Sequence, residues 1–280
     1  MADKIKVRTF PESNYRGIYC NNKTLRIAID PSKPITDLEY PEFYDIKITN
    51  QCNGKCPWCY QNSVPDEEHY PDILSKVRDF FGSMSENQKP FQTAIGGGEA
   101  TLHPEFIGFL KFLSFIGITP NYTTNGTNLT DEILRVSKEV CGGVAISCHE
   151  HLREQWSKAI WKLVEYDIDV NLHIIISDTD SIDKFIEIYN QYSSVVSYFV
   201  LLPHMAQGRA KKKDLCYQAL FDCIENLNID LKKIAFGANF YPYLKPYRKK
   251  FDISLYEPEI MSKFLDLKDM KVYKSSFETS

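Results

Sequence analysis

Short apolar runs alternate with longer amphipathic stretches along most of this chain. In each longer stretch the apolar residues recur every three or four positions, as they do along one face of a helix. This alternation predicts six strand–helix units around a parallel sheet. The predicted strands are FYDIKIT at 43–49, FQTAIGG at 91–97, ITPNYTT at 118–124, GGVAISC at 142–148, DVNLHIIIS at 169–177 and SYFVLLP at 197–203.

Capping and breaking residues bound the predicted helices. Pro71 suits the first turn of a helix that runs to about Met84. Gly117 ends the second helix, and Thr130 caps a third that runs to about Glu139. The remaining helices are expected around 156–164, at 180–192 and at about 214–227.

The two ends of the chain have different patterns. GIYCNNKTLRIAI, at 17–29, predicts an antiparallel hairpin through Asn21 and Asn22, and the tail after Phe236 is aromatic and irregular. Six units are too few for an eight-stranded barrel. The predicted fold class is therefore α/β, a partial (β/α)6 TIM-like barrel with an N-terminal hairpin and a C-terminal aromatic extension. The predicted domain boundaries are an N-terminal β extension at 1–40, the partial barrel at 41–230, and a capping extension of the same domain at 231–280.

Composition and charge exclude several classes of protein. The 280 residues, 43% hydrophobic and 25% charged, fit one large globular domain. A net charge of −4 and a pI of about 5.9 argue against a nucleic-acid binder. The basic cluster at Arg209 and 211–213 is short and lacks aromatics, so a solvated loop is expected there. No apolar run suits a signal peptide or approaches the roughly 18 residues of a membrane span, which predicts a cytoplasmic protein.

Three of the eight cysteines are spaced CxxxCxxC, at Cys52, Cys56 and Cys59. In a reducing compartment such thiols are ligands or free groups, not disulfides. Three thiolates suit an iron–sulfur cube with one iron left open, and a zinc ion completed by a distant Cys or His is an alternative. Burial as small hydrophobes is a third reading, but Asn53 and Lys55 describe a polar loop and favour a metal centre. The other five cysteines are scattered, which predicts packing roles.

Polar loops follow several of the predicted strands. Ligand sites in parallel α/β folds lie at the carboxyl ends of the strands, so these loops are expected to meet around the cysteines. A structural zinc site needs no such convergence, and the arrangement therefore favours catalysis. The loops are Gly96–Glu99, Thr124–Asn125, Ser147–Glu150 and Pro203–Gly208.

With these motifs in place, the chain resembles the radical S-adenosylmethionine (radical SAM) superfamily. The signature of that family is CxxxCxΦC with an aromatic residue before the last thiol, here Trp58. A GGE motif follows at 97–99 and a TTNG string at 123–126, so the resemblance covers about residues 40–210. Ala100 stands where the family usually has proline.

The resemblance implies a [4Fe–4S] cluster on the three cysteines, with S-adenosylmethionine chelating the unique iron. Reductive cleavage, with an electron from an external reductant such as flavodoxin or ferredoxin, then yields methionine and a 5′-deoxyadenosyl radical that abstracts a substrate hydrogen. Glycines let a backbone approach a ligand closely, and carboxylates accept from ammonium groups. The expected cofactor contacts are Trp58, Gly97, Gly98, Glu99, Asn125 and Ser147.

Candidates for catalysis and substrate binding come from strand ends and strand alternation. His149 and Glu150 belong to a dense CHEH group, which suits acid–base work or substrate contact better than a second metal. Tyr122 and His173 are expected to line the cavity, although a lone histidine in an apolar strand is often a hydrogen-bonded core residue.

The aromatic tail predicts either a cap over the open barrel or a stacking platform for a planar ring. Tyr241, Tyr243 and the acidic Glu257 are the substrate candidates there. No cysteine follows Cys223, so the sequence has no cysteine-rich extension for auxiliary clusters.

The predicted function is hydrogen abstraction from a small planar heterocyclic metabolite, with no membrane or nucleic-acid partner. A narrower expectation is a queuine lyase that releases a simpler 7-deazaguanine base. The alternatives are a radical-generating activase or peptide-modifying enzyme, and a metal-binding module without catalysis.

Overall fold

All six predicted strands are present in the computed structural model, which describes residues 5–211, 213, 217–227, 229–247 and 258–278. They lie in chain order and run parallel to one another. The strands are β4 (Phe43–Thr49), β5 (Gln92–Gly97), β6 (Thr119–Thr124), β7 (Gly143–Ser147), β8 (Val170–Ile176) and β9 (Tyr198–Pro203).

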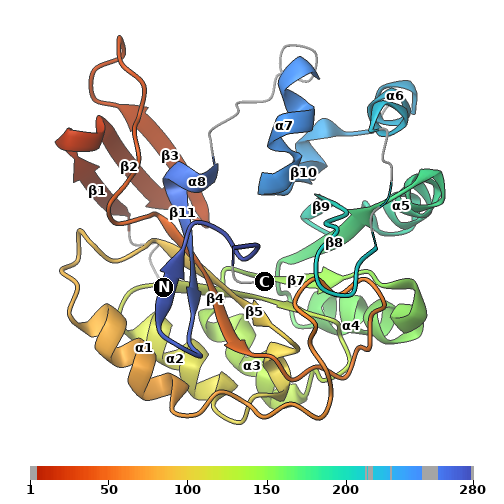
Figure 1. Ribbon diagram of the computed structural model, residues 1–280, viewed down its shortest axis with the longest axis horizontal. Coiled ribbons are helices and arrows are strands. Elements are labelled where there is room, and N and C mark those ends of the chain that lie inside the picture. Colours follow the sequence, from red (N-terminus) through yellow and green to blue (C-terminus); the bar gives the residue numbers. More distant parts are fainter. Residues whose placement is uncertain (1–4, 212, 214–216, 228, 248–257, 279–280) are drawn as a thin grey trace.

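The six helices that follow these strands lie along the convex side of the curved sheet (Figure 1). Thr130 caps α3 as predicted, since its side chain accepts a hydrogen bond from Ile133 N. Gly117 follows α2 with a left-handed φ of 82°. The helices are α1 (Ile73–Gly82), α2 (Phe106–Phe115), α3 (Asp131–Val140), α4 (Arg153–Glu165), α5 (Thr179–Tyr192) and α6 (Gln218–Asn226).

Three short strands near the end of the chain extend the sheet at both edges, which the sequence did not predict. β10 (Ile234–Phe236) pairs parallel with β9 at one edge. At the other edge β11 (Ser262–Asp266) pairs parallel with β4, and β12 (Lys271–Tyr273) pairs antiparallel with β11. Among the described residues, β10 and β12 are the edges of one nine-stranded sheet, which is therefore open. The predicted α/β partial-barrel fold class is confirmed.

The predicted N-terminal hairpin is present and gains a third strand. β2 (Tyr15–Cys20) and β3 (Lys23–Ala28) turn through Asn21 and Asn22, whose φ angles of 50° and 58° are left-handed. β1 (Lys6–Phe10) pairs with β2 on the other side. The buried carboxylate of Glu42, just before β4, accepts hydrogen bonds from Tyr15 Oη and the Arg26 guanidinium. This contact ties the small sheet to the large one.

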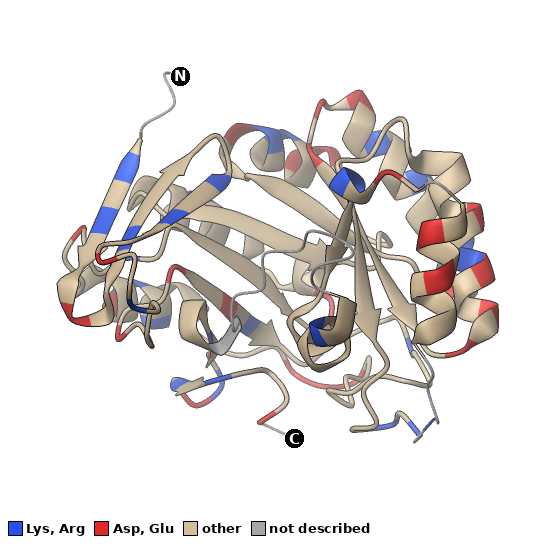
Figure 2. Cartoon of the chain, turned by 90° about the horizontal axis from the view of Figure 1, so that it is seen from above, with Lys and Arg blue, Asp and Glu red and all other residues tan. Residues whose placement is uncertain are grey.

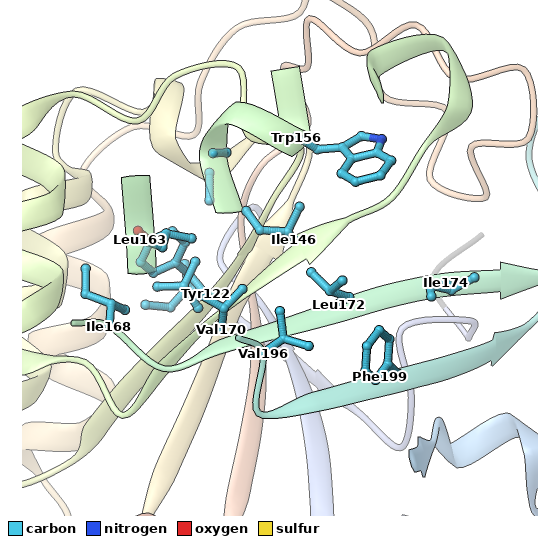
Figure 3. Close-up of a cluster of buried hydrophobic side chains, with 14 of the residues drawn as sticks. Tyr122, Ile146, Trp156, Leu163, Ile168, Val170, Leu172, Ile174, Val196 and Phe199 are labelled. Atoms are coloured by element: carbon cyan, nitrogen blue, oxygen red, sulfur yellow. The ribbon is translucent and has the colours of Figure 1, made fainter. Parts of the chain in front are cut away.

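Alternate residues of each central strand face the helices or the concave side of the sheet. On β8, Val170, Leu172 and Ile174 are buried in the helix-side core (Figure 3), whereas Asn171 and His173 are only half-buried. The concave side is where the loops at the strand ends meet, so this alternation decides which side chains reach the site. No helix among the described residues has the length and apolar composition needed to cross a bilayer.

We expect Leu265→Ala to lower the free energy of unfolding by about 2–5 kcal/mol, because Leu265 is fully buried where β11 completes the core beside β4. The matched control is Val272→Ala on β12, whose side chain is 44% exposed. That change should stay within about 0.5 kcal/mol, as is usual for surface substitutions. Urea unfolding of both variants measures the difference. Equal losses would show that β11 is not part of the cooperative core.

Candidate metal centre

The three clustered cysteines lie on one loop that leaves the carboxyl end of β4. Cys52 N donates to Val64 O at 3.0 Å, which closes the loop on itself. A Cβ built on Gly54 would lie 3.4 Å from Cys52 Sγ and 3.5 Å from Cys56 Sγ. Two of the sulfurs therefore turn toward the same side of a residue whose missing side chain leaves room for them.

The donor set fits an iron–sulfur cube. Within the described part of the chain, no three His, Cys, Asp or Glu side chains meet closely enough to share one metal ion. A tetrahedral zinc needs its ligands around one point, whereas the cysteines of a cube bind different irons. Burial raises the pKa of the Cys52 thiol, and burial with the neighbouring thiols raises the pKa of Cys56 to about 12. Binding a cluster would require these thiols to lose their protons.

Arg209 clamps the cysteine loop from the segment after β9. Its guanidinium donates to Cys56 O at 3.2 Å and to Ser63 O at 2.9 Å, and its backbone N donates to Cys59 O at 3.0 Å. The expectation of a solvated loop is wrong for Arg209, because a planar guanidinium can bridge two carbonyls at once. Lys213 pairs with Asp178 on the surface, and Lys212 lies outside the described residues.

The glycines after β5 press against the backbone of the cysteine loop. Gly98 N donates to Thr49 O at 2.8 Å, and a Cβ on Gly98 would lie 2.0 Å from Gln51 O. Gly97 has a φ of 114°, and a Cβ there would lie 2.3 Å from Thr49 O. Gly96 differs, since an added Cβ would meet no atom within 4 Å. Gly97 and Gly98 therefore seat the loop, and Gly96 borders open space.

Glu99 is a buried junction between the loops after β5 and β6. Its carboxylate is 1% exposed and accepts from Thr101 Oγ1 at 2.6 Å, Thr124 Oγ1 at 2.7 Å and Asn125 N at 2.7 Å. Hydrogen bonds to the ionised form offset the cost of burying the carboxylate. In the described chain these bonds make Glu99 a brace, and its predicted contact with an ammonium group stays a prediction.

Asn125 joins the TTNG turn to the cysteine loop. Its Nδ2 donates to Asn53 Oδ1 at 2.9 Å, and Asn53 also donates to Thr127 Oγ1 at 2.9 Å. Ser147 ends β7 on the concave side, beside His173 of β8 in the strand register. The structure therefore brings Gly97, Gly98 and Asn125 into contact with the cysteine loop and places Ser147 at the next strand end.

Two histidines and Trp58 form an aromatic group over the cysteine loop. The Trp58 ring lies edge-on to His149 at 5.7 Å and to His151 at 5.6 Å between ring centroids. His151 Nε2 lies 2.6 Å from Gly54 O and 3.7 Å from Cys56 Sγ. The sequence predicts roles for His149 and Glu150 of the CHEH group but none for His151, because a turn of 3-10 helix at Glu150–Leu152 decides which side chains point inward.

Glu150 and Tyr122 do not point toward the site. The Glu150 carboxylate accepts from Arg153 at 2.9 Å on the surface, and Arg153 continues to Glu187. Tyr122 is 1% exposed on the helix side of β6 (Figure 3), where its hydroxyl lies 2.9 Å from Ser137 Oγ. The predicted roles of both residues are at odds with these placements, because one side chain is engaged at the surface and the other faces the opposite side of the sheet.

His173 faces the concave side of β8, as predicted. Burial lowers its pKa to about 4, so its imidazole is neutral near pH 7. Burial, His151 and His173 together lower the pKa of His149 to about 4 as well. Two neutral imidazoles therefore belong to this side of the site, one at the end of β7 and one on β8.

The described aromatic tail packs mainly against Tyr217 and Phe221, which lie just before α6 and within it. Tyr243 contacts Tyr217 at 4.4 Å and Phe240 at 6.2 Å between ring centroids, and Phe240 is fully buried. This agrees with a cap over the end of the sheet next to β10. Tyr241 begins the short helix α7 (Tyr241–Leu244). Substrate contacts by Tyr241 and Tyr243 stay predictions, and Glu257 lies outside the described residues.

We expect Gly98→Ala to lower the unfolding free energy by about 1–3 kcal/mol and also to lower the iron retained after reconstitution. The added methyl group collides with Gln51 O and pushes the cysteine loop off β5. Gly82→Ala is the matched control, because an added Cβ at the end of α1 meets nothing within 4 Å. Iron per chain and urea midpoints measure both effects, and equal behaviour of the two variants would contradict the seating role.

We expect the stability of the protein to fall as the pH is lowered from about 6.5 to about 4, partly through His173. In that window the unfolded chain binds a proton at His173 and the folded chain does not, so acid favours unfolding. His173→Gln should flatten this slope, by roughly 1 kcal/mol over the window because the side chain is only half-buried. Urea unfolding at several pH values measures it. An unchanged slope would show that His173 titrates normally.

Comparison with known proteins agrees with this geometry. Residues 46–164 match the family model described as "Radical SAM superfamily", a segment that contains the cysteine loop and the glycine run. A tungsten-containing aldehyde ferredoxin oxidoreductase cofactor-modifying protein of Pyrococcus furiosus is 32% identical over 97 residues, which are 34% of this chain and 27% of that protein.

Solved structures share the fold at low sequence identity. SuiB of Streptococcus suis, crystallised with S-adenosylmethionine, has a TM-score of 0.66 at 13% identity, covering 86% of this chain and 61% of SuiB. The protein anSMEcpe with bound AdoMet has a TM-score of 0.60 at 14% identity, covering 86% and 73%. This chain thus spans about a quarter of the curated relative and about three fifths of SuiB.

The ordered motifs, the parallel half-barrel with its cysteine loop, and the family match agree with one another: residues 46–164 of this chain match the radical SAM superfamily.

Proposed function

We propose that this chain is a radical SAM enzyme whose Cys52, Cys56 and Cys59 hold a [4Fe–4S] cluster. When bound, the cluster supplies an electron, received from an external donor such as flavodoxin or ferredoxin, for reductive cleavage of S-adenosylmethionine and hydrogen abstraction from a substrate by the resulting 5′-deoxyadenosyl radical. The observation that carries this proposal is the cysteine loop seated on Gly98 and clamped by Arg209 at the mouth of an open half-barrel.

The chain's own residues would bind and orient the reactants. Gly97 and Gly98 hold the loop against β5, and Glu99 fixes the turn that carries Asn125. Trp58, with the two histidines packed against it, excludes water from one side of the thiols. In this proposal the strand ends from the glycine run to Ser147 would hold S-adenosylmethionine.

For the substrate we propose a small polar molecule with a planar ring. The concave side offers one buried acceptor for such a molecule, because the Asn171 Oδ1 atom, near the amino end of β8, has no hydrogen-bond partner among the described residues. A buried amide oxygen without a partner costs free energy that a donor on a ligand would recover. The narrower hypothesis is a queuine lyase, since a 7-deazaguanine ring carries such donors on its edge.

A peptide substrate is the second candidate, and the relatives favour it. SuiB has been crystallised with its precursor peptide SuiA, and anSMEcpe with a bound peptide. Their folds resemble this one, although identities of 14% show the fold alone. Formation of 5′-deoxyadenosine that rises on addition of a nucleobase, and not on addition of peptides, would favour the small-molecule proposal.

We expect Cys56→Ala to lose the brown colour of a reconstituted cluster and to form less than about 1% of the wild-type 5′-deoxyadenosine, because two thiolates rarely hold a cube. Cys223→Ala, in α6, is the matched control and should keep both. Anaerobic reconstitution, iron analysis and product chromatography under dithionite measure the result. A colourless wild-type protein that binds zinc, or a Cys56→Ala variant with full turnover, would refute the proposal.

A further inference from the structure

Charged residues are rare on the central strands, and Asp45 is the most unusual of them. Figure 2 shows that charged residues gather on the helices and the N-terminal sheet and leave the long strands largely bare. Across β4 to β9, the only Asp, Glu, Lys or Arg residues are Asp45 and Lys47, both on β4. A charge at the centre of a parallel sheet costs stability unless something compensates it.

Asp45 faces the concave side of the sheet. Tyr44 and Ile46, on either side of it in β4, belong to the helix-side core, so the side chain between them points the other way. Its register partner on β5 is Ala94, which in turn pairs with Asn121 of β6, and Asn121 pairs with Gly143 of β7. Toward β7 the row beside Asp45 carries small or short polar side chains, whereas its register partner on the other side is Phe264 of β11. The carboxyl therefore has open space toward β5 to β7 and not toward β11.

The Asp45 carboxyl has no partner among the described residues. None of them donates a hydrogen bond or forms an ion pair with it, although the side chain is exposed to the interior of the half-barrel. The surrounding protein displaces solvent and raises the pKa of this carboxyl to about 7, although the side chain is exposed to the interior, and no nearby cation lowers it. Lys47 differs, because it pairs with Asp266 of β11 in the strand register. Burial lowers the pKa of Lys47, and the negative charges of Asp266 and Glu67 counter that shift.

The depth of Asp45 separates it from the proposed cofactor site. Its partner Ala94 lies three residues before Gly97. Three residues span about 10 Å along a strand. Gly96, which pairs with Lys47, lies between Ala94 and Gly97 on β5, and open space borders it. A substrate that has one end near the proposed cluster and extends about 10 Å along the strands would therefore place its other end beside Asp45.

Tyr60 connects the level of Asp45 with the cysteine loop that it directly follows. Its ring packs on Phe277, with 4.7 Å between the ring centroids. Burial raises the pKa of the Tyr60 phenol, and the charge of Asp45 contributes to the same rise. Tyr60 and Phe277 therefore pack together directly after the cysteine loop, and Asp45 lies near enough for its charge to act on Tyr60.

We propose that Asp45 is a specificity-determining residue that binds a cationic or hydrogen-bond-donating nitrogen group of the amine or amidine class on the substrate. This inference rests on the proposed function and adds the chemical class of one end of its substrate. An ionised carboxylate that accepts from a cationic donor makes one of the strongest hydrogen-bonded contacts available in a protein interior. Such a ligand supplies the compensation that the described chain does not.

The test is calorimetric binding of benzamidine and of its neutral analogue benzamide to the reconstituted enzyme with S-adenosylmethionine present. Benzamidine should bind the wild type at least about tenfold more tightly than it binds Asp45→Asn. Benzamide should bind the two alike. Asp79→Asn, on the exposed side of α1, is the matched control and should behave as the wild type toward both probes.

Equal benzamidine affinity of the wild type and Asp45→Asn would overturn the inference, as would the absence of saturable benzamidine binding to the wild type. A second readout is the urea midpoint at pH 8. There Asp45→Asn should unfold at about the same urea concentration as the wild type, because the side chain is exposed and the change removes no packing. A clearly lower midpoint would show a structural role and count against the inference. If the wild type forms no 5′-deoxyadenosine, the proposed function fails. If it does and benzamidine does not discriminate, only the role of Asp45 fails.

Discussion

The contact between the glycines after β5 and the backbone of the cysteine loop is the constraint on which the site depends. A carbonyl of the loop lies where a Cβ on Gly98 would be, and the Gly97 backbone occupies a left-handed region that other residues rarely adopt. A hydrogen bond from Gly98 N to Thr49 O closes the same contact. Because the loop is pressed onto the edge of the sheet, its thiols are held at the mouth of the half-barrel rather than out in solvent.

Other contacts extend this constraint outward from the strand ends. Glu99 accepts a hydrogen bond from the turn after β6. Arg209, from the segment after β9, and His151, from the turn after β7, both contact backbone carbonyls of the cysteine loop. Each contact joins segments that are distant in sequence. The cysteine loop is thus a rigid part of the sheet edge, which suits a site that must hold reactive species in a defined geometry.

The two faces of the central sheet have different tasks. The convex face is a continuous apolar core under six helices, and this dense apolar packing explains why the strands were visible in the sequence. The concave face carries small residues, a neutral imidazole and a carboxyl that has no partner among the described residues. Side chains that stabilise nothing in the described chain are reasonable candidates for contact with a ligand.

The sequence by itself determined the order and type of the six strand–helix units, the hairpin and the cysteine loop, because these depend on local periodicity, capping residues and motif spacing. Only the tertiary structure decided that β10 and β11 extend opposite edges of the sheet, that Arg209 and His151 belong to the site, and that Tyr122 and Glu150 point away. Those outcomes depend on long-range pairing and on the direction of single side chains. A shift of one residue in a strand reverses that direction, and no local pattern encodes the partner.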